Sequence, residues 1–230
     1  MKAQAESLNG NMGIRAAMDT REMEWTPSPA GTVLRKRLHL VGDVESGQVT
    51  SFVRYLPGSS FPEHDHPEGE EIFVIKGTFS DHLGDAHEGT HLLNPEGFRH
   101  APHSEPGCLI LVKLRQYGGD GREFHRTQTN DMAWETTRLR GIEQKILYED
   151  DRFPDVTRLE RWAPGTAPGP RQFPGGVEFF VIEGAFEDAE GRHPGGTWLR
   201  LPEGSTLDAR SDNGCVAYVK TGALPTLRST

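Results

Sequence analysis

The sequence predicts an all-β protein, and three observations support this class. The 230-residue chain contains 27 glycines and 16 prolines, which are spread along its length rather than clustered. Short apolar runs rich in β-branched and aromatic residues lie between these turn formers. No segment combines a sustained helical period with end caps. This pattern is typical of short strands in sandwiches or barrels, and it does not distinguish the two shapes.

Composition excludes several classes of partner. The formal net charge is −9, which makes a nucleic-acid backbone or an anionic membrane surface an unsuitable partner. The sequence has neither a membrane span nor a secretory signal, and residues 1–22 are expected to form a mobile tail or a short amphipathic piece. Two cysteines are too few for a disulfide framework, so the expected compartment is the cytoplasm.

The chain contains an internal repeat. The stretch GTHLLNPEG at 89–97 matches GTWLRLPEG at 196–204, and the offset of 107 residues also relates Cys108 to Cys215. This offset holds without a gap over more than fifty residues, so the chain consists of two copies of one unit. The resulting division comprises a tail (1–22), a first unit (23–117), a polar, Gly-containing linker (118–131) and a second unit (132–225).

The expected strands occur as matching sets in the two copies. Each run is bounded by Gly or Pro and is rich in strand-forming residues. The first copy has VTSFVRYL (49–56), EIFVIKG (71–77) and CLILVKL (108–114), and the second has VTRLERW (156–162), EFFVIEG (178–184) and CVAYVKT (215–221).

A cluster of metal-ligand types precedes one of these strands. His64 and His66 are two residues apart, so on a strand both imidazoles leave the same face, about 6.5 Å apart at the backbone. A turn follows, and Glu70 opens the next strand beside them. His100, after the turn formers Pro95 and Gly97, offers a fourth ligand. Three imidazoles and a carboxylate suit one divalent zinc, iron, nickel, manganese or copper ion.

The spacing of these residues resembles that of a known family. Gly58-x5-His64-x-His66-x3-Glu70-x6-Gly77 is similar to the first cupin motif, and Gly89-x5-Pro95-x-Gly97-x2-His100 is similar to the second, departing from it only at Ser104. Two further segments resemble the cupin domain of ChrR-type anti-sigma factors, namely HPEGEEIFVIKGTFSD and GCLILVKL. The resemblance covers most of residues 23–225. It implies two tandem cupin (double-stranded β-helix, jelly-roll) barrels, with a metal held by His64, His66, Glu70 and His100.

The resemblance does not extend to the sigma-binding domain of that family. ChrR-type anti-sigma factors carry an N-terminal helical domain that grips the sigma factor and binds zinc through His and Cys. The residues before Trp25 contain neither Cys nor His. We therefore expect no sigma-factor binding by this chain alone.

The second copy serves as an internal control for the ligand set. At the offset of 107, the four candidate ligands fall on Arg171, Phe173, Val177 and Leu207, so we expect no metal in that copy. Glu71 falls on Glu178 and persists, which favours a structural role such as pairing with an arginine on the outer face. In the second copy, Arg171 and Glu178 are expected to form either an ion pair or a solvated pair.

Other residues with reactive side chains receive structural interpretations. His82, His87 and His103 are expected to be solvated, and Cys108 and Cys215 to be small buried thiols.

Two functions fit the first copy. One is a sensor or small-molecule-binding module, in which zinc holds the barrel. The alternative is a non-haem iron dioxygenase acting on a diketone, hydroxyketone or phenolic compound. A metal-dependent isomerase is a third hypothesis, but the sequence indicates no residue that would act as its general base. The family resemblance favours a homodimer, and a monomer is the alternative. In an enzyme, apolar groups near the ion would shape the pocket, and the candidates are Phe52, Phe61, Phe73, Phe98 or Leu111.

Overall fold

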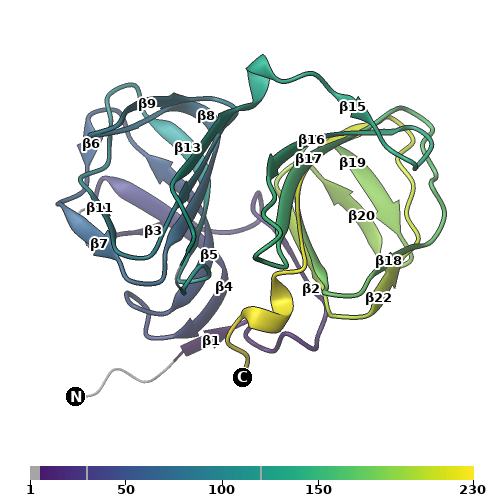
Figure 1. Ribbon diagram of the computed structural model, residues 1–230, viewed down its shortest axis with the longest axis horizontal. Coiled ribbons are helices and arrows are strands. Elements are labelled where there is room, and N and C mark those ends of the chain that lie inside the picture. Colours follow the sequence, from purple (N-terminus) through teal and green to yellow (C-terminus); the bar gives the residue numbers. More distant parts are fainter. Residues whose placement is uncertain (1–5, 30, 120) are drawn as a thin grey trace. The chain divides into compact units, whose positions relative to one another are not determined.

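The computed structural model describes residues 6–29, 31–119 and 121–230, and it divides into two compact units. Unit 1 holds residues 6–10, 23–131 and 228–230, and unit 2 holds residues 11–22 and 132–227. Both units consist of antiparallel strands, and the only helices among the described residues are the short η1 (Thr129–Asp131) and η2 (Leu224–Thr226) (Figure 1). No described helix is long and apolar enough to cross a membrane.

Unit 1 is a barrel with one large sheet and smaller sheets that complete it. The large sheet has the order β1-β4-β5-β13-β8-β10-β14, and β7–β11 and β6–β12 form further pairs. The strands of this unit are β1 (Glu6–Leu8), β3 (Thr26–Pro27), β4 (Val33–Gly42), β5 (Gln48–Tyr55), β6 (Ser59–Ser60), β7 (His64–His66), β8 (Glu70–Asp81), β9 (Gly84–His87), β10 (Thr90–Asn94), β11 (Phe98–His100), β12 (His103–Ser104), β13 (Cys108–Leu114) and β14 (His125–Gln128).

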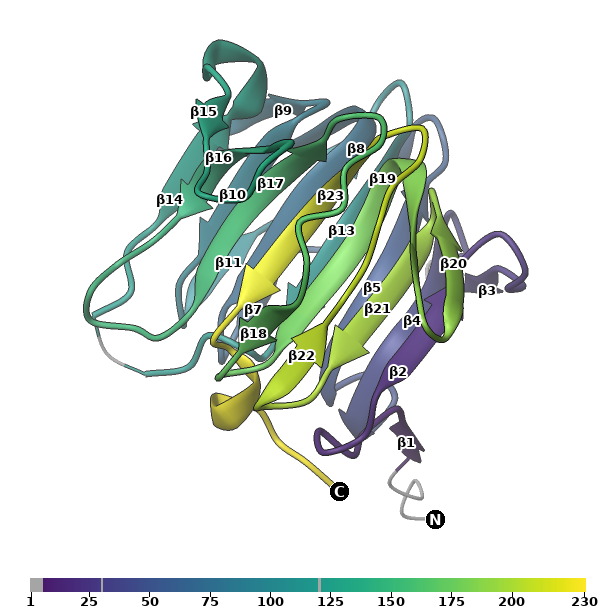
Figure 2. The ribbon, with the colours of Figure 1, turned by 90° about the vertical axis from the view of Figure 1, so that its right-hand side faces the viewer.

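Unit 2 repeats this plan. Its main sheet has the order β15-β16-β17-β23-β19-β21-β2, and β18 pairs with β22 (Figure 2). The strands are β2 (Ala16–Asp19), β15 (Glu135–Thr136), β16 (Ile142–Tyr148), β17 (Val156–Trp162), β18 (Arg171–Phe173), β19 (Val177–Asp188), β20 (Gly191–Pro194), β21 (Thr197–Leu201), β22 (Ser205–Leu207) and β23 (Cys215–Thr221).

Strand alternation determines which side chains line each barrel. In β8, Ile72 and Val74 belong to the hydrophobic core of unit 1. Glu70 lies on the same face because it is two residues before Ile72, whereas Glu71 and Phe73 face the other way. Val177 and Phe179 belong to the core of unit 2 in the same way. Glu70 therefore points into the barrel interior, where a binding site can form.

Two segments differ from the expectation. In the predicted tail, β1 pairs with β4 and β2 pairs with β21. The guanidinium of Arg200, which is 1% exposed, donates to the carbonyl oxygen of Asn11 at 2.9 Å. In the predicted linker, β14 pairs with β10. Both segments add edge strands, where few apolar residues are needed, so their sequences do not have the pattern of a buried strand.

The two cysteines are free and buried, which confirms the expectation for them. Burial raises the pKa of both thiols to about 11. Each thiol is therefore a small apolar group that packs in its core.

Gly77 and Gly184 explain why one glycine recurs in both copies. Gly77 has φ +82°, and a Cβ there would overlap the carbonyl oxygen of Gly107. Gly184 has φ +68° and the same relation to Gly214. Only glycine combines this backbone conformation with so close an approach.

We predict that Gly77→Ala lowers the free energy of unfolding by about 2 kcal/mol, because it adds a steric overlap to a left-handed conformation. The matched control is Gly58→Ala, since Gly58 has φ +73° and open space around a Cβ. This control should cost about 1 kcal/mol. Urea titrations followed by tryptophan fluorescence measure both, and equal losses in the two variants would contradict the steric argument.

Candidate metal centre

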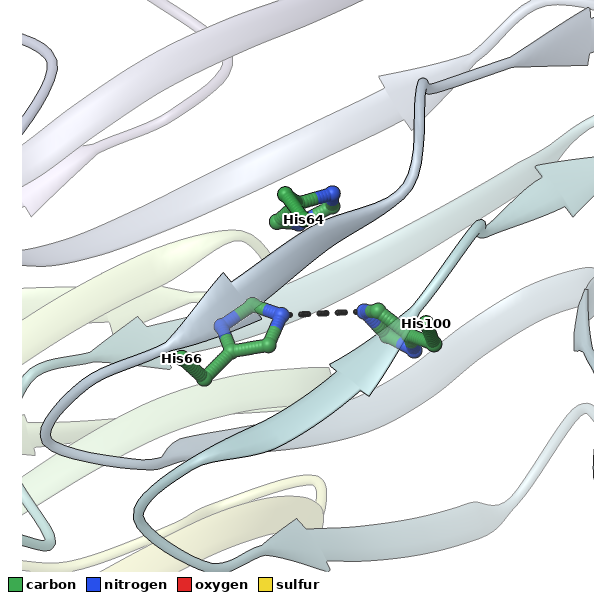
Figure 3. Close-up of side chains that lie close together, drawn as sticks. All are labelled: His64, His66 and His100. Carbon is green, nitrogen blue, oxygen red and sulfur yellow. Dashed lines mark hydrogen bonds between the residues drawn. The ribbon is translucent and has the colours of Figure 1, made fainter.

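The pairing of two short strands brings the three predicted histidines together. β7 and β11 are antiparallel, with His64 opposite His100 and Phe98 opposite His66. His64 and His66 alternate with the exposed Asp65, so both imidazoles leave the other face of β7. Figure 3 shows them beside His100, with His66 hydrogen-bonded to it. The turn at residues 67–69 then returns the chain to Glu70 at the start of β8.

The donor atoms converge closely. The Nε2 atoms of His66 and His100 lie 3.0 Å apart, and one donor atom from each of the three histidines lies within 4.8 Å of the others. Glu70 Oε2 lies 3.5 Å from His66 Nε2 and 3.6 Å from His100 Nε2. Two nitrogens about 3.0 Å apart fit neighbouring positions around one ion whose bonds are about 2.1 Å long. The structure therefore brings the three imidazoles together, with the Glu70 carboxylate beside two of them.

Hydrogen bonds from neighbouring groups orient the side chains that could bind the metal. His64 Nδ1 donates to the carbonyl oxygen of Pro62 at 2.8 Å, and His100 Nδ1 donates to Asp81 Oδ2 at 2.9 Å. Each bond leaves the Nε2 lone pair of its imidazole available. Asn94 Nδ2 donates to Glu70 Oε2 at 2.8 Å and fixes that carboxylate.

The electrostatic environment favours the ligand form of these groups. Burial lowers the pKa of His66, and His100 and His64 add to this effect while Glu70 opposes it. His66 is therefore held as neutral imidazole. Burial tends to raise the pKa of Asp81, but hydrogen bonds from His100 and from the Leu83 backbone outweigh it and hold that pKa below its usual range.

Glu70 itself tests whether a cation fits here. Its side chain is buried, and among the residues that the structure describes no arginine or lysine lies within ion-pair distance of it. Burying a carboxylate without a compensating charge is strongly unfavourable. A divalent ion bound by neutral imidazoles would supply that charge, so the donor set fits a metal.

A cavity of about 190 Å³ adjoins these donors. Val53, Tyr55, Ile110 and Val112 form part of its wall, next to His64, His66 and Glu70. Burial raises the pKa of the Tyr55 phenol far above its usual value, so the group stays neutral.

Only Phe61 among the predicted apolar residues lines this cavity. The expectation is wrong for Phe52, Phe73 and Leu111, which are register neighbours on the opposite face of the sheet. Phe98 does not line the cavity, but its ring lies 5.4 Å from that of His100, and it also stacks on Phe124 with ring centroids 5.8 Å apart. The strand alternation that places Glu70 inside puts Phe73 outside.

Glu71 has hydrogen-bond partners within unit 1, which fits the structural role expected for it. It is 1% exposed and accepts hydrogen bonds from His91 Nε2 at 2.8 Å and from the Tyr117 hydroxyl. In unit 2 the equivalent Glu178 accepts from Trp198 Nε1 at 3.1 Å. In both units this glutamate therefore accepts a hydrogen bond from the side chain at the same repeat position, which is His91 in unit 1 and Trp198 in unit 2. His82, His87 and His103 are exposed, as expected.

Unit 2 fills the corresponding position with an ion cluster. The two guanidinium nitrogens of Arg171 donate to the carboxylate of Glu160 at 2.7 and 2.9 Å, and Arg158 Nε donates to it at 2.9 Å. The expected pairing of Arg171 with Glu178 is wrong, because these side chains leave opposite faces of the barrel wall. Phe173, Val177 and Leu207 pack in the core. Among the described residues, the three histidines of unit 1 are the only group of metal-ligand side chains.

The sequence comparison overlooked Asn94 and Glu160. Asn94 is replaced by Leu201 in the second copy, so it is lost together with Glu70, and this joint loss could have identified it. Glu160 takes the place of Val53, and a buried charge at that strand position could have indicated a filled barrel.

Comparisons with known proteins agree with this architecture. The model of the ChrR cupin-like domain matches residues 14–118 and 122–225. The chain belongs to this family. The prediction of two tandem cupin barrels is thereby confirmed. No curated protein matches the chain.

Several solved structures share the fold at low sequence identity. A proposed dioxygenase from Nostoc punctiforme has a TM-score of 0.74 at 17% identity, covering 99% of this chain and 90% of that chain. A proposed glyoxylate-induced protein from Pseudomonas aeruginosa has 0.72 at 13%, covering 100% and 94%. An oxalate decarboxylase variant from Bacillus subtilis has 0.63 at 14%, covering 90% and 77%.

We predict that the ion cluster of unit 2 makes its stability depend on pH. Burial tends to raise the pKa of Glu160, but Arg171 and Arg158 outweigh it and hold the pKa at about 2, below the ordinary 4.5. A carboxyl whose pKa is depressed on folding stabilises the protein above its unfolded pKa, and this contribution is lost as pH falls through the folded pKa. Glu160→Gln should cost about 3–5 kcal/mol at pH 7.

Urea unfolding of wild type and Glu160→Gln at pH 7, 4 and 2.5 tests this. The difference between them should shrink as pH falls from about 4.5 toward 2. Glu187→Gln, which removes a more exposed partner of Arg210, is the control and should cost less than about 1 kcal/mol. A difference that does not change with pH would contradict the assignment.

Proposed function

We propose that unit 1 binds one divalent transition metal through His64, His66, Glu70 and His100, and that the adjoining cavity binds a small molecule at that metal. The cavity is the observation that carries this proposal. A structural zinc site is closed by its protein ligands, whereas three of these four side chains border an open space. Zinc, iron, nickel and manganese all accept this donor set.

The residues around the metal have distinct roles in this proposal. When bound, the divalent ion supplies Lewis acidity that polarises an oxygen of the small molecule. Asp81 and the Pro62 carbonyl hold two imidazoles in the ligating tautomer, and Asn94 holds the Glu70 carboxylate. Val53, Ile110 and Val112 exclude water from the apolar part of the ligand.

The role that we favour is a small-molecule-binding or regulatory one, in keeping with the ChrR cupin-like family. Unit 2, which lacks the ligand set, serves as a metal-free scaffold. The two buried, unpaired thiols fit a reducing compartment, so we assign the protein to the cytoplasm as part of this proposal.

A metal-dependent dioxygenase is the second candidate. Its support is the fold that the chain shares with the proposed dioxygenase from Nostoc punctiforme, together with a cavity large enough for a small diketone or phenolic substrate. The same histidines would then hold iron, and the ion would need coordination sites left open by the protein.

We predict that His66→Ala and His100→Ala each reduce metal content from about one ion per chain to near zero. Wild type should also gain thermal stability from added metal, by about 2.7 kcal/mol at a free metal concentration 100 times the Kd, because only the folded state binds. Metal analysis after dialysis and thermal unfolding with and without added zinc measure both effects.

The controls are Glu71→Gln, which changes the neighbouring buried carboxylate, and His103→Ala, which removes an exposed imidazole. Both should retain the metal. Full metal content in His66→Ala or His100→Ala would remove that residue from the ligand set.

Oxygen consumption separates the two candidate functions. Under the favoured role, the native protein contains zinc, and the iron-loaded protein consumes no oxygen with pentane-2,4-dione. Iron in the native protein and steady oxygen uptake that disappears in His100→Ala would instead support the dioxygenase.

A further inference from the structure

Arg115 adopts a backbone conformation that is unfavourable for its residue type. It has φ 60°, and Asn9 is the only other described non-glycine residue with positive φ. At the offset of 107, the equivalent residue of unit 2 is Gly222, which has φ +78°. The fold therefore requires a left-handed backbone conformation at the residue after this strand. Unit 2 has glycine there, the residue type that adopts this conformation without strain. Unit 1 retains a guanidinium there despite the strain.

The position of Arg115 relates this guanidinium to the metal centre. Its backbone N–H donates to the carbonyl oxygen of Gly69 at 3.0 Å, in the turn between His66 and Glu70. The preceding residue, Leu114, is the register partner of Glu70. Arg115 lines the same cavity as these donors. Within the described part of the chain, its guanidinium has no carboxylate at ion-pair distance, so its charge is available to a ligand.

Two further arginines line the cavity, and they are also specific to unit 1. Arg35 and Arg37 both contact Glu45, at 3.0 and 3.2 Å. Strand register equates them with Gln144 and Ile146 of unit 2. The copy with the imidazoles is thus also the copy with all three cavity arginines.

The charges favour a negative ligand. Glu45 and Asp65 also border the cavity, and Glu45 is engaged by Arg35 and Arg37. With the Glu70 carboxylate bound to a divalent ion, three arginines stand against the two remaining carboxylates, Glu45 and Asp65, so the cavity wall keeps a surplus of one positive charge.

We infer that the ligand of this cavity is a small organic anion, with oxygen donors at the metal, an apolar body against Val53 and Ile110, and a carboxylate paired with Arg115. This inference rests on the proposed function and adds the substrate class. Arg115 is then the residue that selects for the negative charge.

Two matched probes test the inference on the full chain loaded with zinc. 4,6-Dioxoheptanoate carries a β-diketone and a carboxylate, and heptane-2,4-dione is its neutral counterpart. Titration calorimetry should give at least about ten-fold tighter binding for the anionic probe, which is the value of one charge-assisted pair. Arg115→Gly should reduce the preference to less than about two-fold, and Arg115→Lys should restore part of it.

The variant Arg115→Gly installs the residue of unit 2, so it relieves strain and should unfold at the same or a higher temperature than wild type. Its metal content and its affinity for heptane-2,4-dione should be unchanged. Arg192→Gln, which removes one exposed charge from unit 2, is the control and should keep the full preference.

The possible failures are distinguishable. Equal affinity of wild type for the two probes, no binding of either, or a preference that survives in Arg115→Gly would overturn the inference, while one bound metal per chain would still support the proposed function. Loss of metal in Arg115→Gly would also overturn it, because Arg115 would then act on the metal centre. A wild-type protein that holds no metal after reloading would overturn both.

Discussion

Each barrel has a buried carboxylate facing its interior, and each site follows from how that charge is compensated. In unit 1 the carboxylate is Glu70, which is surrounded by imidazoles and the Asn94 amide. In unit 2 it is Glu160, which lies between Arg158 and Arg171. A buried carboxylate without a cation would destabilise either barrel by several kcal/mol. Unit 2 therefore carries its own cations, whereas the cation proposed for unit 1 would come from solution.

Both units place these side chains on the same arrangement of paired strands. β7 pairs with β11 in the register that β18 and β22 repeat, so His64 opposite His100 corresponds to Arg171 opposite Leu207. The positions of the side chains are thus set by strand pairing that both copies share, and a few substitutions decide the chemistry. Because Arg158 and Arg171 already compensate Glu160, the interior of unit 2 needs no metal ion for this purpose.

Much of this architecture was predictable, because repeats and strand alternation are local properties of the sequence. The internal repeat identified two copies of one unit, the motif resemblance implied that each is a barrel, and the spacing of His64 and His66 placed both imidazoles on one strand face. Partners that depend on strand neighbours distant in sequence were not predictable. Glu160 and Arg171 are eleven residues apart and meet only across the barrel interior. Two partners of Glu71, His91 on β10 and Tyr117, come from segments that are distant from it in sequence. Edge strands such as β2 and β14 carry too few apolar residues to be recognised.

The path of the chain also limits how the two barrels can be separated. β2 belongs to unit 2 although it precedes all but β1 of unit 1, and residues 228–230 belong to unit 1 although they follow all of unit 2. A fragment beginning at residue 132 would lack β2. Its β21 would become a bare edge, with Arg200 deprived of its acceptor at Asn11 and with backbone groups open to pairing with another copy. Proteolysis within residues 118–131 would therefore separate β2 from the remaining strands of unit 2.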